Sequence, residues 1–226
     1  MTKLLETIEI ETGKNPAASI IWMHGLGADG NDFVPIVGEL GLDGGPAVRF
    51  VFPHAPMRPV TINNGFVMRA WYDVSFGDLE GKSRQADERG VRESQAQINA
   101  LIEREEKRGV PAANVLLAGF SQGGAIALHT GLRHPRKLAG VMALSTYLPL
   151  AEALPSEGSA ANKSTPVFMA HGMFDNVVPL MMGAGSMTFL AGLGYAIEWC
   201  QYPMQHSVCP EEIRDIGTWL RKILES

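Results

Sequence analysis

The chain lacks the features that mark secreted, membrane-spanning and nucleic-acid-binding proteins. Its 226 residues include only two cysteines, and such sparse use is typical of a reducing compartment. No apolar run approaches the roughly 18 residues of a membrane span, and the first residues lack the pattern of a signal peptide. The net charge is −5, without a basic cluster that would neutralise phosphates. We therefore expect a cytoplasmic protein that neither binds nucleic acid nor inserts stably into a membrane.

Patterns typical of metal sites are also missing. Cys200 and Cys209 flank His206 in a C-x5-H-x2-C arrangement, which suggests either half of a metal site or a disulfide-closed loop. No second pair of Cys or His ligands lies at a usable spacing, so we expect no metal. The compartment and the length of the chain disfavour a Cys200–Cys209 disulfide, although the sequence leaves that pairing open.

Short apolar runs recur along the chain and indicate a parallel sheet. Glycine, proline or asparagine bounds each run, and strands that are apolar on both faces belong to sheets covered by helices on both sides. The runs occupy residues 19–23, 48–52, 115–120, 138–144 and 166–170. The alternating segment TIEIE near the start predicts an antiparallel edge strand in addition.

Helical patterns lie between the apolar runs. In the last segment, PEEIRDIGTWLRKIL, Pro210 suits a first helical turn and the two glutamates after it suit the positive end of a helix. Further helices are expected at residues 91–109, 121–134 and 179–193. This alternation predicts an α/β fold: a doubly wound, mostly parallel sheet with helices on both faces, in a single domain spanning 1–226. The remaining segments 53–87 and 149–164 look irregular and are too short for a large cap domain.

The pentapeptide Gly-Phe-Ser-Gln-Gly at residues 119–123 follows one predicted strand and precedes a predicted helix. Strand, tight turn and helix form the setting of a nucleophile elbow, which lifts a serine hydroxyl above the sheet. The turn leaves no room for β-carbons two residues before and after the serine, which explains both glycines. Ser121 is therefore the candidate nucleophile.

A serine hydroxyl needs a base, and this architecture places the residues in the order Ser, acid, His along the chain. Asp175 follows a predicted strand end, where such sheets present residues to ligands. His206 is the histidine that comes after Asp175, whereas His171 at the preceding strand end is expected to support the loop that carries the acid. Chain order thus predicts the triad Ser121, Asp175 and His206.

Acyl transfer also requires donors for the oxyanion. One donor is expected to be the backbone N–H of Gln122, the residue after the nucleophile. The second is expected from the turn His24-Gly-Leu-Gly27 after an early strand, where the N–H of Leu26 is the best candidate.

The motifs HGLGADGNDF, GFSQGG, ALSTYLPL and HGMFDNVVP, followed by the His206 segment, resemble the acyl-protein thioesterases and the small bacterial carboxylesterases similar to them. These are α/β-hydrolases without a large cap, and the resemblance runs from about residue 18 to the C-terminus. The segment MRAWYD resembles the family's Trp-aromatic-Asp stretch beside the active site. That match implies a place for Trp71 near an acyl groove, with Leu26, Leu79 and Val178 as further apolar walls.

The resemblance implies a serine hydrolase that cleaves carboxylic esters, acyl thioesters or both through an acyl-enzyme, without a cofactor. Removal of acyl groups from S-acylated proteins is one expected main role, and the family contains monomers and homodimers. Two alternatives stay open: acyl transfer to another acceptor from the same site, and a non-catalytic module that binds acylated partners.

Overall fold

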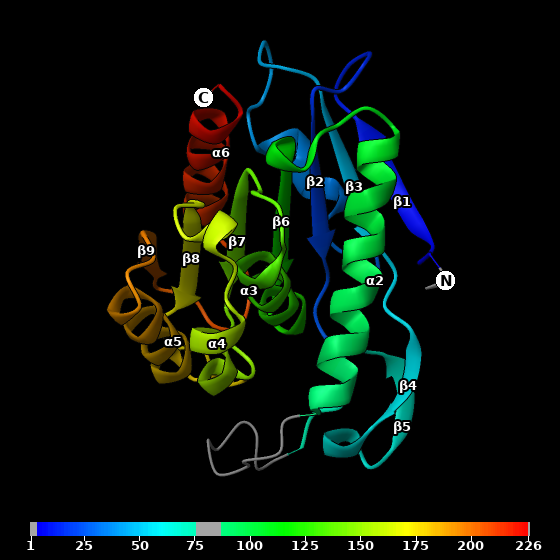
Figure 1. The fold of residues 1–226 in the computed structure, drawn as a ribbon. Helices are drawn as coiled ribbons and strands as arrows, with labels where there is room; N and C mark the ends of the chain where they lie inside the picture. Colours follow the sequence, from blue (N-terminus) through cyan, green and yellow to red (C-terminus); the bar gives the residue numbers. More distant parts are fainter. Residues whose placement is uncertain (1–3, 76–86, 226) are drawn as a thin grey trace.

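The computed structural model describes residues 4–75 and 87–225, and a seven-stranded sheet lies at its centre (Figure 1). The strand order is β1-β3-β2-β6-β7-β8-β9. These strands are β1 (Thr7–Glu11), β2 (Ala18–Met23), β3 (Val48–Pro53), β6 (Val115–Phe120), β7 (Gly140–Leu144), β8 (Val167–Gly172) and β9 (Ile197–Tyr202). Strand β1 pairs antiparallel with β3, and the other pairings in this sheet are parallel. The predicted mostly parallel sheet and its antiparallel edge strand are confirmed.

Helices cover both faces of the sheet (Figure 1). One face is packed by α2 (Glu88–Lys107), α3 (Gln122–Arg133) and α5 (Leu180–Gly192), and the other by α6 (Pro210–Leu224) and the short 3-10 helix η1 (Val34–Glu39). Side chains alternate along each strand: Ile21 joins the first core, whereas Ile20 and Trp22 join the second. The predicted doubly wound architecture is therefore confirmed.

The helix ends follow the signals in the sequence. Pro210 is the first residue of α6, and Glu211 and Glu212 lie in its first turn, where acidic side chains favour the helix dipole. Helix α2 begins three residues earlier than expected, because the Asp87 side chain accepts a hydrogen bond of 2.9 Å from the Gly90 amide and caps it.

Two segments expected to be irregular contain regular structure. Residues 53–87 include a hairpin of β4 (Met57–Val60) and β5 (Phe66–Arg69), joined by a 3-10 turn, η2 (Thr61–Asn63). The turn closes through Asn64 and Gly65, both at positive φ. Residues 149–164 hold three short helical turns: η4 (Ala151–Ala153), α4 (Leu154–Glu157) and η5 (Ala160–Asn162). Neither segment forms a large cap within the described residues.

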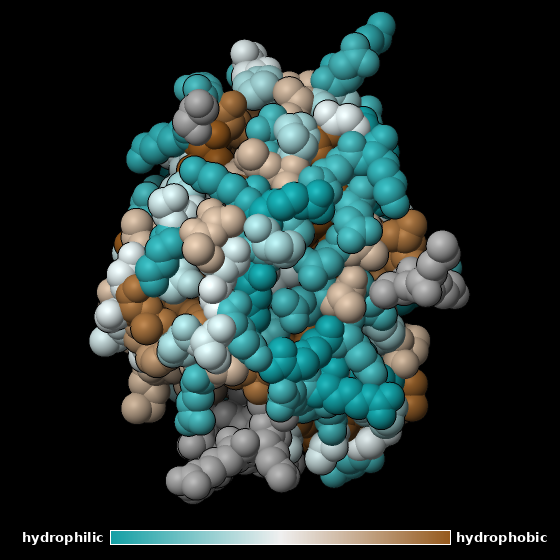
Figure 2. Space-filling model, viewed as in Figure 1, coloured by the Kyte–Doolittle hydropathy of each residue, from teal (hydrophilic) through white to brown (hydrophobic). Residues whose placement is uncertain are grey.

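The molecular surface over α2 is mostly hydrophilic, as an amphipathic covering helix requires (Figure 2). In the part of the chain that the structure describes, no helix has both the length and the apolarity needed to cross a bilayer.

Candidate active site

Ser121 occupies the tight turn between β6 and α3, with φ 54° and ψ −122°. A left-handed φ is costly for a residue with a side chain, and it persists only where the surroundings enforce it. Here the Ser121 amide donates to the Leu144 carbonyl at 2.8 Å, and the Thr146 hydroxyl donates to the Ser121 carbonyl at 2.7 Å. Neighbouring strand β7 and the residues after it therefore hold the serine in its strained conformation.

The two glycines that flank the serine allow backbone segments to approach one another closely. A β-carbon on Gly119 would lie 2.3 Å from the carbonyl carbon of Gly123, and one on Gly123 would lie 2.3 Å from the Met23 carbonyl oxygen. Real β-carbons do not occur at such distances, so larger residues would force the turn apart. The reason expected for both glycines is confirmed, and the turn is thereby packed directly against the end of β2.

The structure brings the three side chains predicted from chain order into contact. His206 Nδ1 lies 2.7 Å from Asp175 Oδ2, and His206 Nε2 lies 2.9 Å from Ser121 Oγ. A carboxylate can only accept, so Nδ1 carries the proton and the Nε2 lone pair accepts from the serine hydroxyl. The Asp175 side chain has no exposed surface, whereas 14% of the His206 side chain is exposed. The arrangement can move a proton from the serine hydroxyl to an imidazole that a buried carboxylate orients.

Asp175 is itself held by the loop between β8 and α5. Its Oδ1 accepts from the Val177 amide at 2.9 Å and from the Val178 amide at 2.8 Å. Buried His171 donates through Nε2 to the Val178 carbonyl at 2.9 Å, and burial lowers the pKa of this histidine, keeping it neutral. The expectation that His171 supports this loop agrees with these contacts.

The two segments expected to supply oxyanion donors lie against each other. A β-carbon added to Gly25 would meet the Ser121 β-carbon at 3.4 Å, so the turn after β2 lies beside the serine. Within residues 4–75 and 87–225, no acceptor takes the backbone N–H of Leu26 or of Gln122. Among the described residues, both amides are therefore left without an internal acceptor.

The residues expected to line an acyl groove are mostly buried in the structure. Trp71 is completely buried, so it offers no surface to an open groove in this structure, and its expected place near an acyl groove stays a prediction. Val178 is only 4% exposed, and its backbone serves the Asp175 loop. Leu26 is half-buried, and Leu79 lies outside the described residues. Sequence alone does not distinguish a core aromatic from a groove aromatic, because both are apolar residues near a strand end.

The sequence did not point to other apolar surfaces near the triad. A hollow of about 400 Å³ lies beside His206 and is lined in part by Phe33, Phe120, Val208 and Ile213. The Phe120 and His206 rings are 4.7 Å apart between centroids. Met173, Phe174 and Val177, next to Asp175 in the chain, are exposed. Apart from Ile213 on α6, these residues stand in loops or at element ends, where apolar periodicity gives no signal.

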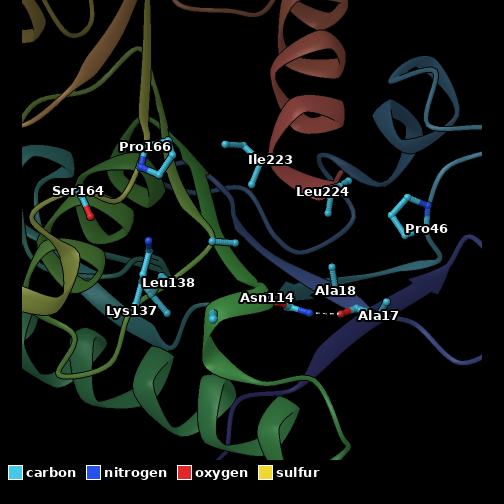
Figure 3. A pocket seen from close by; sticks show the side chains of 12 residues that line it. Ala17, Ala18, Pro46, Asn114, Lys137, Leu138, Ser164, Pro166, Ile223 and Leu224 are labelled. Atoms are coloured by element: carbon cyan, nitrogen blue, oxygen red, sulfur yellow. Dashed lines mark hydrogen bonds between the residues drawn. The ribbon is translucent and has the colours of Figure 1, made fainter. Parts of the chain in front are cut away.

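A cavity of about 490 Å³ opens at the other end of the sheet, where β2, β7 and β8 begin (Figure 3). Its polar side chains are Asn114, Lys137 and Ser164, and Asn114 is occupied by a hydrogen bond of 2.9 Å to the Ala17 carbonyl. No nucleophile and base meet there. The cavity is therefore not the candidate active site.

In the described part of the chain, no group of three or more His, Cys, Asp or Glu side chains is placed to hold a metal ion. Cys200 and Cys209 are free thiols, and burial raises the pKa of both. His206, which lies between the two cysteines in the chain, makes its hydrogen bonds to Ser121 and Asp175.

Comparison with known proteins now identifies the family. A family model described as Phospholipase/Carboxylesterase matches residues 5–224. The chain belongs to this family. The resemblance noted in the sequence is confirmed, and the protein is a hydrolase of the phospholipase/carboxylesterase and acyl-protein thioesterase group.

Relatives in the family cover nearly the whole chain. The chain is 37% identical to acyl-protein thioesterase 1 of Cryptococcus neoformans over 239 aligned positions, which cover 100% of each protein. It is 41% identical to acyl-protein thioesterase 1 of Neurospora crassa over 218 positions, covering 92% of this chain and 87% of that one.

Solved structures of the same group share the fold. The crystal structure of Arabidopsis thaliana SOBER1 has a TM-score of 0.82 at 32% identity, covering 92% of this chain and 99% of that one. Acyl-protein thioesterase 2 of Zea mays has a TM-score of 0.83 at 28% identity, covering 97% and 99%. An α/β-hydrolase fold without a large cap is thus common to the chain and its structural relatives.

Proposed function

We propose that this hydrolase cleaves carboxylic esters and acyl thioesters through an acyl-enzyme on Ser121, with His206 as the base and Asp175 as the residue that orients it. The observation that carries the proposal is the unbroken hydrogen-bonded series from Ser121 Oγ through His206 to Asp175 Oδ2. In this series, His206 Nε2 is unprotonated and faces the Ser121 hydroxyl, as a general base requires.

In the acylation step, Ser121 Oγ attacks the acyl carbonyl carbon while His206 Nε2 takes the serine proton. The negative charge of Asp175 stabilises the imidazolium that forms, without accepting the proton itself. The amides of Leu26 and Gln122 donate to the oxyanion, and Gln122 also stands at the positive end of α3. Collapse of the tetrahedral intermediate transfers the proton from His206 to the leaving alcohol or thiol.

In the deacylation step, His206 removes a proton from a water molecule, which attacks the acyl-enzyme carbonyl. The same two amides stabilise the second oxyanion, and the proton returns to Ser121 Oγ as the carboxylic acid leaves. Every proton transfer passes through His206 Nε2, so one imidazole serves both half-reactions without a cofactor.

The apolar surface around the triad supports an acyl substrate. The hollow is lined in part by His206, and the exposed Met173, Phe174 and Val177 adjoin Asp175 in the chain, so hydrocarbon surface accompanies two members of the proposed triad. Relatives that bear the name acyl-protein thioesterase 1 favour S-acylated proteins as one substrate class, alongside small acyl esters. The missing large cap leaves room for a substrate carried on another protein.

The decisive experiment replaces the nucleophile. Ser121→Ala is expected to lower kcat/KM at least about a thousandfold on nitrophenyl butyrate and on an S-acylated peptide, because no acyl-enzyme forms. A fluorophosphonate should label the wild-type protein at Ser121 and leave the variant unlabelled.

The matched control is Ser156→Ala, which replaces an exposed serine on α4 and should keep wild-type turnover. Turnover of the Ser121→Ala protein at the wild-type rate would refute the proposal.

A further inference from the structure

Trp71 links the two segments that carry the proposed oxyanion donors. Its indole Nε1–H donates to the His24 carbonyl at 2.9 Å, in the turn that contains Leu26. Its backbone N–H donates to the Gln122 side-chain oxygen at 2.7 Å, at the start of α3. We propose that Trp71 is a positioning residue that holds these two segments at a fixed separation and so sets the geometry of the oxyanion hole. This inference rests on the function proposed above.

The Gln122 side chain completes the connection. Its Nε2 donates to the Tyr72 carbonyl at 2.7 Å, so its carboxamide bridges the backbone of Trp71 and Tyr72. The side chain of Gln122 thereby fixes the residue whose own N–H faces the oxyanion. An ordinary helix start needs no such side chain, and glutamine at this position is explained by the two bonds that it makes.

His24 fixes the other donor. Its Nδ1 donates to the Gly25 carbonyl at 2.7 Å, and its Nε2 accepts from the Ala55 amide at 3.1 Å. The Gly25 carbonyl and the Leu26 N–H belong to one planar trans peptide and point in opposite directions. Fixing the carbonyl toward His24 therefore turns the Leu26 N–H away from it. Burial lowers the pKa of His24 to about 4, so the imidazole is neutral at pH 7 and keeps its acceptor nitrogen.

The whole connection is shielded from water. Trp71 is 0%, His24 2% and Gln122 4% exposed, and the Trp71 and His24 rings lie 5.3 Å apart between centroids. The Ser94 hydroxyl also donates to the Trp71 carbonyl. A buried donor or acceptor that loses its partner cannot turn to solvent, so the donors and acceptors keep these partners. Preorganised dipoles of this kind cost no rearrangement when charge develops.

The chain contains its own control for the test. Trp22 on β2 is also buried, at 1% exposed, but its Nε1 has no hydrogen-bond partner within the described residues. Trp71→Phe and Trp22→Phe therefore remove the same atoms from two buried sites, and only the first loses the bond to the His24 carbonyl.

The measurement combines kinetics with two inhibitors. We expect Trp71→Phe to lower kcat/KM on nitrophenyl butyrate about tenfold or more, since a small misplacement of donors is costly, and Trp22→Phe to lower it less than about twofold. The Ki of an alkyl trifluoromethyl ketone, which forms a tetrahedral adduct with the serine, should rise by a similar factor in Trp71→Phe. The Ki of the matched methyl ketone, bound as the ground state, should not change. A purely structural loss would weaken both ketones equally.

The proposal is overturned if both Phe variants lose the same activity per folded molecule, or if Trp71→Phe weakens both ketones alike. Should Trp71→Phe not fold, Gln122→Met removes the two carboxamide bonds and must show the same selective loss of trifluoromethyl ketone affinity. Unchanged affinity in that variant also overturns the proposal. The result with Ser121→Ala is separate: activity there defeats the proposed function itself, whatever Trp71 does.

Discussion

The carboxyl end of the sheet and its β1 edge both bury polar side chains, but with opposite chemistry. At the carboxyl end, His24, Trp71 and Gln122 are neutral and joined by hydrogen bonds. At the β1 edge, Arg49 Nη1 and Glu105 Oε2 form an ion pair at 2.7 Å, with side chains 8% and 0% exposed. On the oxyanion side of Ser121 the buried groups are dipoles, whereas at the β1 edge they are opposite charges.

The difference indicates what each region is for. Under the mechanism proposed above, fixed neutral dipoles around Ser121 stabilise a charge that exists only during the reaction. The ions at the edge are paired in the resting protein: Arg104 on α2 and Arg108, the residue after its last turn, pair with Glu9 on β1 at 2.8 and 2.9 Å. These pairs fasten an edge strand to the helix beside it. Substitutions at the first region should therefore change rates, and substitutions at the second should change stability.

The largest expected effect comes from Asp175→Asn at the site. The oxygen of the new carboxamide still accepts from the Val177 and Val178 amides, but its NH₂ group now faces His206 Nδ1. That nitrogen must then accept, so Nε2 carries the proton and cannot take one from Ser121. We expect kcat/KM to fall by about three to four powers of ten, with less than about 1 kcal/mol lost in the free energy of unfolding. Ester hydrolysis and urea denaturation measure the two quantities; a large loss of stability with modest loss of rate would contradict the comparison.

Much of this end of the sheet is predictable from sequence, for physical reasons. Strands buried on both faces appear as continuous apolar runs, and the flanking glycines of Ser121 reflect backbone contact that no β-carbon permits. Chain order then singled out Asp175 and His206, which the structure places in hydrogen-bond contact with each other and with the serine. Their catalytic roles stay predictions until the variants are measured, as does the single-domain organisation.

Other features have no local signal. The β4–β5 hairpin is short, contains Pro59 and exposes Phe66 and Val67, so it lacks the alternation of a half-buried strand. The motif around Trp71 predicts a place near the groove, whereas the burial of this side chain depends on partners such as Gln122, 51 residues away. Pairing between distant segments decides which apolar residues remain exposed, and no single stretch of sequence carries that information.

At the β1 edge, Glu105→Met should lower the free energy of unfolding without lowering kcat/KM. Among the residues that the structure describes, the substitution leaves buried Arg49 with Glu11 as its one remaining ion-pair partner. Removing one member of a buried pair costs about 3–5 kcal/mol, whereas replacing both by apolar residues is much less costly. We expect a loss of about 3 kcal/mol in urea denaturation for Glu105→Met, partial recovery in Arg49→Met/Glu105→Met, and unchanged kcat/KM in folded protein. A double variant less stable than either single one would contradict this account of the edge.

The smallest expected effect is a difference between the two regions in how the free energy of unfolding depends on pH. Burial lowers the pKa of His24 from 6.5 to about 4, so between these values the unfolded chain binds a proton that the folded protein does not. His24 therefore contributes stability above pH 6.5 that is lost as the pH falls toward 4, by up to about 1.4 kcal/mol per pH unit. His24→Gln keeps an acceptor for the Ala55 amide but does not titrate, so its unfolding free energy should fall less steeply over this range in urea denaturation at pH 7, 6, 5 and 4.5.

Glu105→Met is the matched control for that slope. Burial acts to raise the pKa of Glu105, but hydrogen bonds from Arg49 and Ser19 outweigh burial and hold it below its ordinary value of 4.5. Its contribution is present above pH 4.5 and is lost only as the pH falls below that. Glu105→Met should thus run parallel to wild type between pH 6.5 and 4.5, while His24→Gln diverges from it. If the unfolding free energies of all three proteins changed in parallel with pH, the pKa of His24 would not be lowered by burial. The neutral imidazole that orients the Gly25–Leu26 peptide would then have no support from the pH dependence.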